Sequence, residues 1–457
     1  MKKEKIENIL ENLLSTGGDF AEVFLEDATT KSFSYVNSNL DAYKIGFKSG
    51  IGLRLARDNS VYYGATNDLS NNGIENIVTS LKNNIKDDAL ITRVKLKRLK
   101  KYKNSKNTHY SNSELKEKFN DLDKLIRSKD KRINQVNIIL NNTVQKVTIA
   151  RESGLYVSDE RVYSRIYITV GFKDLDKVCD ITYSKGMTMS IDFLDLIDFD
   201  SVCKNLIKDG LDKLYAKPCI GGEMPVIIEN GFGGVIFHEA CGHAMEATSV
   251  APGLSVLSNE LNNQIANSKV SIVDDGTLPL EWGSTNIDDE GHETKANMLI
   301  EDGVLKGFLI DELNNRKMNM KLTGSGRRES YRYAPTSRMN NTYLLPGTDT
   351  LKDMLKSIKL GLYAKSMGGG CVTPETGEFN FACNLAYMIR DGKIAECVKS
   401  ASLIGTCKDI LKNVEAVGDN LDLGQGYCGS ISGSVPVNVG MPRIKVSKIL
   451  VGGENEE

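Results

Sequence analysis

The sequence predicts an α+β protein made of a small N-terminal α/β unit, a middle domain that combines helices with a sheet, and a mostly β C-terminal domain. Two observations support this class. Segments with apolar residues at period two are interleaved with segments at helical spacing, and glycine becomes frequent after Glu223. At about 100 to 200 residues per domain, 457 residues allow two to four domains. We expect the domains to be residues 1–92, 93–218 and 219–457.

The first unit is expected to begin with an amphipathic helix that ends at Gly17–Gly18, where two glycines terminate the helical repeat. Alternating apolar residues predict strands at 19–26 and 51–57, and apolar residues at helical spacing predict a helix over 74–85. A small α+β unit would bury the apolar side of each of these elements.

The next stretch, Arg93–Lys106, contains eight basic residues and no acidic residue. Such a run is typical of a solvated connector or an edge strand, and a phosphate-binding patch is the alternative. Beyond it, Ser111 and Glu114 have the spacing of a capping box at the start of a helix. Alternation between 136 and 170 predicts a sheet, and a second helix is expected over 202–215.

The C-terminal region is expected to start with a strand at 224–228, followed by a glycine-rich turn at 231–234 and an apolar helix over 235–247. Asp302-Gly303 and Asp391-Gly392 lie between apolar runs and predict two-residue hairpin turns. A mostly β domain built around one helix follows from this pattern.

The composition argues against two classes of protein, those built mainly to bind nucleic acid and those that span a membrane. The formal net charge of -2 argues against a chain built mainly to bind nucleic acid. No stretch resembles a membrane span of about 20 apolar residues, and Glu4, Glu7 and Glu11 occupy the place of a signal peptide's apolar core. The nine cysteines form no CxxC pair. We therefore expect a cytoplasmic protein with reduced thiols.

The chemistry concentrates in one six-residue string, His238-Glu239-Ala240-Cys241-Gly242-His243, which holds two of the four histidines in the chain. This HExxxH pattern suits a metal centre, because two neutral imidazoles bind a divalent cation. A carboxylate beside the first imidazole can act as the general base towards water. The alternative is a buried helix whose histidines are merely hydrogen-bonded.

The spacing of this pair has a geometric consequence. Five steps leave the two imidazoles roughly 140 degrees apart around an ideal helix, so an ideal helix cannot chelate with this pair. One extra residue accommodated as a π-bulge would return both to the same face, and Gly242 would tolerate the distortion. The sequence therefore predicts an over-wide or kinked helix between 238 and 243.

A catalytic zinc usually has three protein ligands, so a third is required. Glu246 could bind the metal or could orient an imidazole, and Cys241 is in the motif but more often such a residue packs as a small hydrophobe. Cys428 lies in a glycine-rich loop that lets the backbone approach another group closely. The residues alone leave these alternatives open.

Several segments together resemble the TldD side of the TldD/PmbA family of metallopeptidases, strongly over Gly221–Gly453 and more loosely before it. They are GGVIFHEACGHAME, SIVDDG (271–276), NIDDEG (286–291), GRRES (326–330), MGGG (367–370) and CGSISGSVPVNVGMP (428–442). The resemblance implies zinc bound by His238, His243 and Cys428, with Glu239 as general base. A local departure, SISG after the cysteine, removes no ligand.

The same resemblance implies an endopeptidase that cleaves unfolded or small peptides. It also implies a dimer, formed with a PmbA (TldE) type of subunit that lacks the metal motif or with a second copy. A β-rich domain could bind an extended peptide as an added strand. The candidate donors for the oxyanion are Arg327, Arg328, Tyr331 and His292, which the sequence does not rank. Two alternatives are a zinc amidase acting on small molecules and a gyrase-type modulator that binds DNA through Arg93–Lys106.

Overall fold

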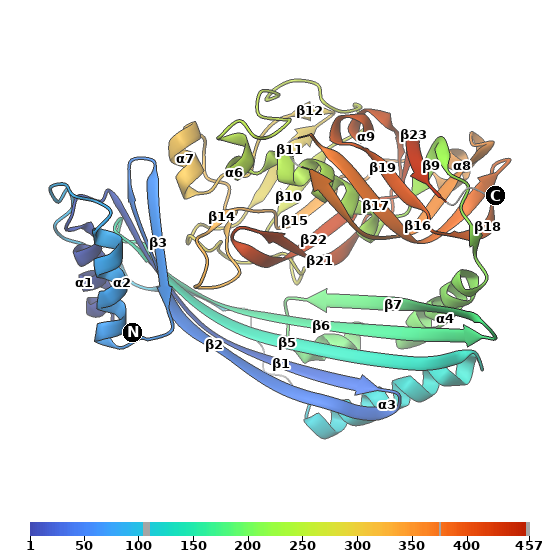
Figure 1. Ribbon diagram of the computed structural model, residues 1–457, viewed down its shortest axis with the longest axis horizontal. Coiled ribbons are helices and arrows are strands. Elements are labelled where there is room, and N and C mark those ends of the chain that lie inside the picture. The colour runs from blue at the N-terminus through green and yellow to red at the C-terminus, as the bar shows by residue number, and fades with distance from the viewer. Residues whose placement is uncertain (104–109, 374–375, 454–457) are drawn as a thin grey trace.

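The computed structural model describes residues 1–103, 110–373 and 376–453. The chain forms two parts that lie side by side along its length (Figure 1). A long curved sheet from the first half of the chain lies beneath a C-terminal part whose described residues form two larger sheets and one two-stranded sheet. The predicted α+β class is confirmed, and the C-terminal region is mostly β as expected.

The described residues of the first part form a seven-stranded sheet in the order β3-β2-β1-β5-β6-β4, with β7 also paired to β6. Its strands are β1 (Phe20–Val36), β2 (Asn39–Arg57), β3 (Ser60–Thr66), β4 (Lys100–Lys103), β5 (Ile133–Arg151), β6 (Tyr156–Asp174) and β7 (Lys177–Met187). Strands from the first two predicted domains therefore share one sheet, because β1 pairs with β5. The predicted division at residue 92 stays a prediction.

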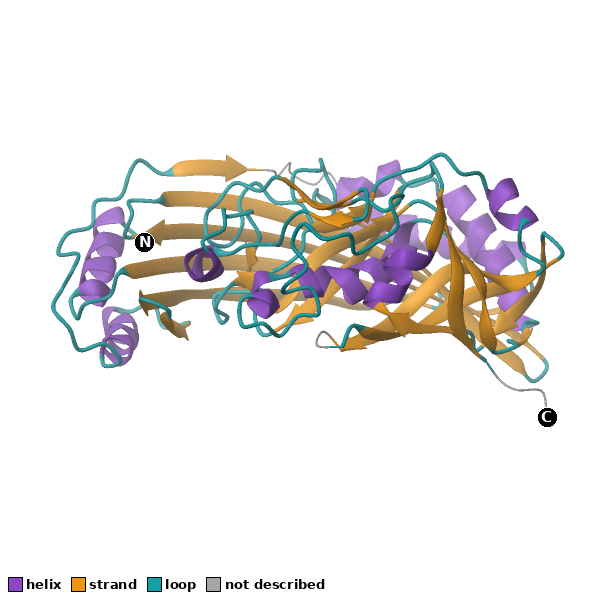
Figure 2. Ribbon diagram, turned by 90° about the horizontal axis from the view of Figure 1, so that it is seen from above, coloured by secondary structure: helices purple, strands orange, loops and turns teal. Residues whose placement is uncertain are grey.

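Helices gather at the two ends of these long strands (Figure 2). They are α1 (Lys3–Leu14), α2 (Asn71–Lys82), α3 (Asn112–Lys129), a 3-10 turn (Ile191–Leu196) and α4 (Phe199–Leu214). The apolar face of α1 is buried and the helix ends before Gly17, whose φ is 98°. The capping box of α3 is present, with Ser111 and Glu114 bonding each other's backbone. These features confirm the helix signals read from the sequence.

Two strands are longer than expected. The predicted strands at 19–26 and 51–57 continue through polar residues, because β1 pairs with β2 from Phe20 to Val36, with one register shift after Ser34, and with β5 from Glu22 to Val36. The basic run supplies β4, which pairs with β6 at the edge of the sheet, as the edge-strand interpretation predicts. Residues 104–106 of that run lie outside the described residues.

The C-terminal part contains an eight-stranded and a six-stranded sheet among its described residues. The first consists of β8 (Lys217–Pro218), β9 (Gly222–Ile228), β16 (Leu360–Thr373), β17 (Glu378–Arg390), β18 (Lys393–Lys399), β19 (Ser402–Thr406), β20 (Val414–Val417) and β23 (Ile444–Gly452). The second has the order β12-β11-β10-β15-β22-β21. Its strands are β10 (Ile272–Asp275), β11 (Ala296–Glu301), β12 (Val304–Leu305), β15 (Asn341–Leu344), β21 (Asp422–Ser430) and β22 (Gly433–Met441).

Smaller elements connect these sheets. They are α5 (Val235–Phe237), α6 (Ala247–Val250), α7 (Glu312–Met318), α8 (Leu351–Lys356), α9 (Cys407–Asn413), and the short pair β13 (Gly326–Arg327) and β14 (Thr336–Ser337). The two predicted hairpin turns are confirmed, with positive φ at Asp302-Gly303 and Asp391-Gly392. No helix in the described part of the chain is long and apolar enough to cross a membrane.

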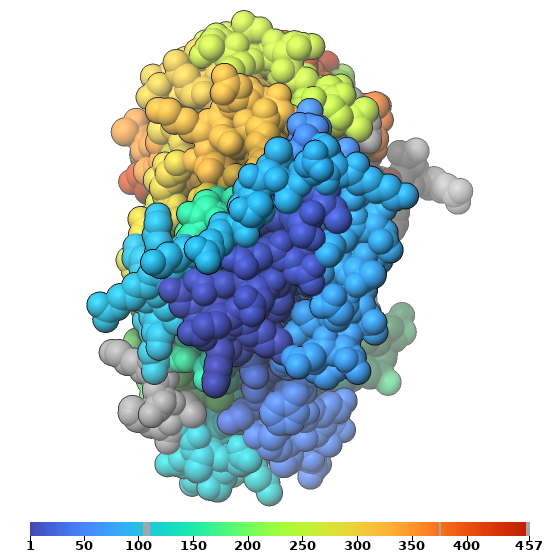
Figure 3. All heavy atoms as spheres, turned by 90° about the vertical axis from the view of Figure 1, so that its left-hand side faces the viewer, coloured from blue at the N-terminus to red at the C-terminus, as the bar shows by residue number. Residues whose placement is uncertain are grey.

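Figure 3 shows the end of the molecule at which the N-terminal residues lie against the C-terminal part. Buried charges join the two parts. Arg54 of β2 bonds Glu22 and Glu290, each at 2.7 Å, and Arg328 bonds Glu22 at 2.6 Å. Glu290 and Arg328 come from the NIDDEG and GRRES segments. Burial raises the pKa of Glu290 to about 7, although Arg54 opposes the shift. These segments fix the sheet against the C-terminal part.

Candidate metal centre

The HExxxH segment is a π-helical turn, His238–Gly242, between α5 and a 3-10 turn, His243–Met245. The predicted over-wide turn is therefore confirmed. It brings the two imidazole rings to 5.3 Å between centroids, at an angle of 81° between planes. The helix ends earlier than predicted, because Glu246 adopts extended backbone with ψ 125°. Its neighbour Ala247 donates instead to the carbonyl of Leu309.

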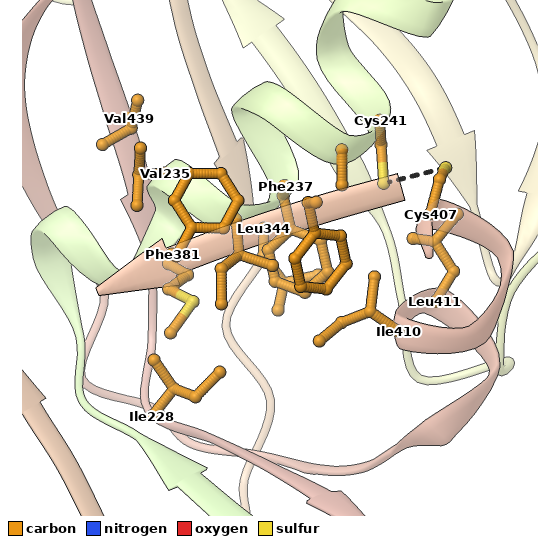
Figure 4. Close-up of a cluster of buried hydrophobic side chains, with 14 of the residues drawn as sticks. Ile228, Val235, Phe237, Cys241, Leu344, Phe381, Cys407, Ile410, Leu411 and Val439 are labelled. Carbon is orange, nitrogen blue, oxygen red and sulfur yellow. Dashed lines mark hydrogen bonds between the residues drawn. The ribbon is translucent and has the colours of Figure 1, made fainter. Parts of the chain in front are cut away.

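The turn is held by apolar packing on both sides. Residues of α5 and of the π-turn belong to one core with side chains from both C-terminal sheets. Figure 4 shows Phe237 of this segment among Leu344, Phe381 and Ile410. Because a close-packed core resists displacement of its members, the histidines are held in fixed positions.

Gly242 has a role that differs from the one predicted. Its backbone is ordinary right-handed helix, with φ -59° and ψ -52°, so no special conformational freedom is required there. A Cβ at this position would instead meet the sulfur of Met339 at 2.1 Å. Glycine is needed because Met339 packs directly against the turn.

Three predicted ligands meet at this turn. His238, His243 and Cys428 each offer a donor atom, and the three atoms lie within 4.8 Å of one another. Cys428 comes from β21, at the end of the β21–β22 hairpin, where it pairs with Val435. Residues 185 positions apart in the chain are thus brought into contact.

The donor set fits a zinc ion. Nε2 of His243 lies 3.2 Å from Sγ of Cys428, close to the separation of about 3.5 Å that donors have around tetrahedral zinc. Nδ1 of His238 is buried and has no hydrogen-bond partner among the described residues, so this ring has an uncommitted nitrogen. Two imidazoles and a thiol are ligands that zinc prefers.

The electrostatics favour the thiolate that a metal requires. Burial alone would raise the pKa of Cys428, but His238 and then His243 hold it well below its ordinary value. Burial would likewise lower the pKa of His243, yet Glu246 and Cys428 raise it well above its usual range. The two histidines therefore favour the thiolate form of Cys428, which is the form in which cysteine binds a metal.

Glu239 lies beside this cluster. Its Oε2 is 3.5 Å from Nε2 of His243, and its side chain keeps 27% exposure, whereas His238 is almost fully buried. The carboxylate is therefore next to the ligand atoms and within reach of solvent. This placement suits a group that exchanges protons with water near a metal.

Glu246 contacts the opposite nitrogen of His243. Its Oε2 is 3.0 Å from Nδ1, whereas Nε2 of the same ring faces Cys428. A carboxylate on the far nitrogen orients the ring and fixes its tautomer. The geometry therefore favours the orienting role for Glu246 over the ligand role.

Arg338, which sequence reasoning missed, connects the two halves of the cluster. Its side chain is fully buried, with Nε 3.7 Å from Oε1 of Glu246. The same guanidinium donates to the carbonyl of Cys428 and, at 2.9 Å each, to Ser432 and Gly433. One arginine thus holds both the carboxylate behind His243 and the loop that carries Cys428. No sequence signal distinguishes it from other arginines.

Cys241 points away from the cluster. Its sulfur lies 3.3 Å from the sulfur of Cys407 at the start of α9, as the dashed line in Figure 4 shows. Both thiols are buried, and burial raises the pKa of Cys241 well above its ordinary value. The geometry therefore favours Cys241 as a packed, buried thiol and not as a metal ligand.

The predicted oxyanion donors lie mostly elsewhere. Arg328 is paired with Glu22 in the contact between the two parts. His292 lies 2.9 Å from Glu312 in the same region. The ring of Tyr331 packs against Gly50 of β2. Arg327 is nearer the cluster, because it donates to the carbonyl of Met339, which packs on Gly242. His109, the fourth histidine, lies outside the described residues.

Comparison with known families gives matches over most of the chain. Residues 221–453 match the model of the PmbA/TldA metallopeptidase C-terminal domain. Residues 106–214 match that of the central domain and residues 21–85 that of domain 1.

Three relatives carry related names. The chain is 37% identical to a metalloprotease TldD homolog of Haemophilus influenzae, over 73% of this chain and 71% of the relative. It is 32% identical to the metalloprotease TldD homolog of Buchnera aphidicola, over 97% and 95% of the two chains. It is 28% identical to a zinc metalloprotease TldD homolog of Saccharolobus solfataricus, over 96% and 97%.

A solved structure has the same fold. TldE from Thermococcus kodakarensis superposes with a TM-score of 0.76 and covers 98% of this chain and 99% of its own. At 18% identity the likeness concerns the fold alone.

Proposed function

This chain belongs to the PmbA/TldD family of metallopeptidases, and from that premise we propose that it is a zinc-dependent endopeptidase that cleaves unfolded or extended peptides. The observation that supports the proposal most is the meeting of His238, His243 and Cys428 around one point, with Glu239 beside them. Three ligands from the chain would leave the fourth position of a zinc ion to water, as in catalytic zinc sites.

In the proposed mechanism, His238, His243 and Cys428 hold the ion and Glu239 handles the proton. A zinc ion bound there would supply Lewis acidity towards a peptide carbonyl and would make water more acidic. Glu239 accepts the proton of the attacking water on its carboxylate and returns it to the leaving amine. Glu246 keeps the His243 ring in orientation throughout, because it bonds the far nitrogen.

We expect a preference for unfolded chains because the peptide bond must reach a cluster that is mostly buried. His238 and Cys428 are buried, and His243 and Glu239 are only partly exposed, so we expect the reacting bond to enter a recess of the surface. A single extended strand can enter such a recess, whereas a folded domain cannot present its backbone there. The edge position of β21, which carries Cys428, suits a peptide that adds as a strand.

A cleavage assay tests this function. The zinc-loaded protein should degrade a permanently unfolded substrate, such as reduced and alkylated casein, and should leave a stable folded protein intact. Removal of metal with a chelator should abolish cleavage, and stoichiometric zinc should restore it, which gel electrophoresis can follow. Cleavage that persists at full rate in the metal-free protein would contradict the proposal.

The assembly and compartment belong to the same proposal. We expect a dimer, with a PmbA/TldE-type subunit or with a second copy, in a reducing cytoplasm. All nine cysteines are free thiols in this structure, which suits that compartment. The DNA-modulator alternative gains no support, because Lys100 and Lys103 of the basic run contact Glu293 and Glu160.

Arg338 offers a test of how the centre is supported. The Arg338→Met variant should bind zinc about 10-fold to 100-fold more weakly, the usual cost of disturbing groups behind metal ligands. Competition with a zinc indicator dye measures this affinity. Arg338→Lys should retain part of the affinity, because it keeps the charge beside Glu246. Arg390→Met, which removes an exposed ion pair with Glu396, should leave affinity unchanged. If the Arg338→Met variant bound zinc as tightly as the parent, Arg338 would not be needed to hold the metal centre.

A further inference from the structure

A cavity of about 320 Å³ lies between the long sheet and the β21–β22 hairpin. The hairpin forms the side of the C-terminal part that faces the sheet in Figure 1. Strand β1 contributes Glu26 to the lining, β6 contributes Tyr163, and the hairpin contributes Tyr427 and Pro436. Arg327 also lines the cavity. The function proposed above assigns no role to this space.

The carboxylates that line this cavity already have partners. Asp289 accepts from Arg161 at 2.6 Å and from the backbone of Arg328 at 2.8 Å. Glu26 accepts from Gln145 and from the backbone of Tyr331, each at 2.8 Å.

Glu329, at the same cavity, is engaged in the same way. It accepts from the backbone of Ser434 at 2.9 Å and lies 3.8 Å from Lys48. The acidic groups of the lining are therefore committed to the protein itself.

Two donors of the lining are not committed in this way. Arg327 is 3% exposed and donates to two carbonyls, those of Met339 at 2.6 Å and Pro436 at 2.8 Å. Among the described residues, no carboxylate lies within ion-pair distance of it, and none of them bonds the hydroxyl of Tyr163. Burial raises the pKa of Tyr163, so its hydroxyl stays a donor. A guanidinium remains charged in proteins, and a buried charge is costly when no opposite charge pairs with it, even where carbonyls accept its hydrogen bonds.

Arg327 also ties the cavity to the metal centre. Met339, whose carbonyl it bonds, packs on Gly242 next to His243. Pro436, the other partner, pairs with Tyr427, the neighbour of Cys428. The cavity therefore adjoins the strand that carries Cys428, and Arg327 and Met339 connect it to the turn that carries the two histidines. A peptide held at the centre could extend into it.

We propose that this cavity binds a carboxylate of the peptide substrate through Arg327 and Tyr163, an inference that rests on the peptidase function proposed above. A planar guanidinium matches a carboxylate with two parallel hydrogen bonds. A phosphate dianion suits the cavity less well, because Glu26, Asp289 and Glu329 line it too. A single negative charge balances Arg327 without adding repulsion from these acids.

Calorimetric titration of the full chain tests this directly. The protein is the zinc-loaded Glu239→Gln variant, which should not consume the peptide, and the same titrations are run on metal-free protein. The probes are an unstructured ten-residue peptide without Asp or Glu, its C-terminal amide, and an amide with one internal Glu. We expect the free acid to bind about 10-fold to 100-fold more tightly than the plain amide, the range for hydrogen bonds to a charged group.

The third peptide identifies the source of the carboxylate. Tight binding of the free acid alone assigns the cavity to a chain terminus, and tight binding of the Glu-containing amide assigns it to a side chain. Equal affinity for all three peptides overturns the inference. Because binding is measured with and without zinc, this outcome is distinct from failure of the peptidase assay, which concerns metal-dependent cleavage.

Variants locate the effect. Arg327→Gln should erase the preference for the carboxylate, and Tyr163→Phe should reduce it several-fold while keeping the ring that packs on Trp282. Arg332→Gln, a change of an exposed arginine in the same segment, should keep the full preference. If the Arg327→Gln variant does not fold, the Tyr163→Phe variant still tests whether the carboxylate binds in this cavity. A preference that survives in Tyr163→Phe and in folded Arg327→Gln would place the carboxylate elsewhere.

Discussion

The Glu239→Gln variant is expected to keep about one zinc per chain and to lose about 10²-fold to 10⁴-fold of its peptidase rate, the range for removing a general acid and base. The amide matches the carboxylate in shape but cannot take the proton of water. The side chain lies 3.5 Å from Nε2 of His243, which places it beside the proposed ligands without making it one of them. Rate on an unfolded substrate and zinc content by mass spectrometry are measured on the same sample.

A surface carboxylate provides the control for this variant. Glu223 is on β9 and its side chain is mostly exposed, so Glu223→Gln should retain both zinc and rate. If Glu239→Gln cleaved the unfolded substrate as fast as the parent, another group would have to act as the base. Loss of zinc together with rate would instead make Glu239 a contributor to metal binding.

The Cys428→Ala variant is expected to lose the metal itself. Its sulfur is one of three donor atoms that lie within 4.8 Å of one another, and its removal leaves only two imidazoles. Changes behind metal ligands already cost about 10-fold to 100-fold in affinity, so loss of a ligand should cost at least about 100-fold. Zinc affinity and peptidase rate should fall together.

The chain offers matched controls for this change. Cys371 is exposed on β16 and lies outside the cluster, so Cys371→Ser should keep the parent's zinc content. Because a cavity at position 428 could loosen the hairpin, thermal unfolding of Cys428→Ala should be compared with that of metal-free parent. Full zinc occupancy in a folded Cys428→Ala protein would show that another group serves as the third ligand.

Local patterns predicted the elements well, because they depend on neighbouring residues. The capping box at Ser111 and the turns at Asp302 and Asp391 follow from side chains that act within a few positions. The π-turn followed from the spacing of His238 and His243, since no regular helix could bring the two rings together. The lengths of β1 and β2 were not predictable, because pairing with neighbours extends strands through polar segments.

The residues that hold the candidate metal centre in place could not be predicted from the sequence. Arg338 is 92 positions from Glu246, and its importance arises only because the fold places it between that carboxylate and the Cys428 loop. The same holds for Gly242, whose necessity comes from Met339 rather than from its backbone. The acidic and arginine-rich motifs at 286–291 and 326–330 were recognisable as strings, yet their role in joining the long sheet to the C-terminal part arises from contacts that only the fold creates.

X-ray absorption at the zinc edge of the purified, zinc-loaded parent tests the central claim most directly. The account predicts one sulfur at about 2.3 Å and two imidazole nitrogens at about 2.0 Å from the metal, the distances of a Cys-His-His site. A spectrum with nitrogen and oxygen neighbours but no sulfur, at full zinc occupancy, would contradict the assignment of Cys428 and with it the centre described above.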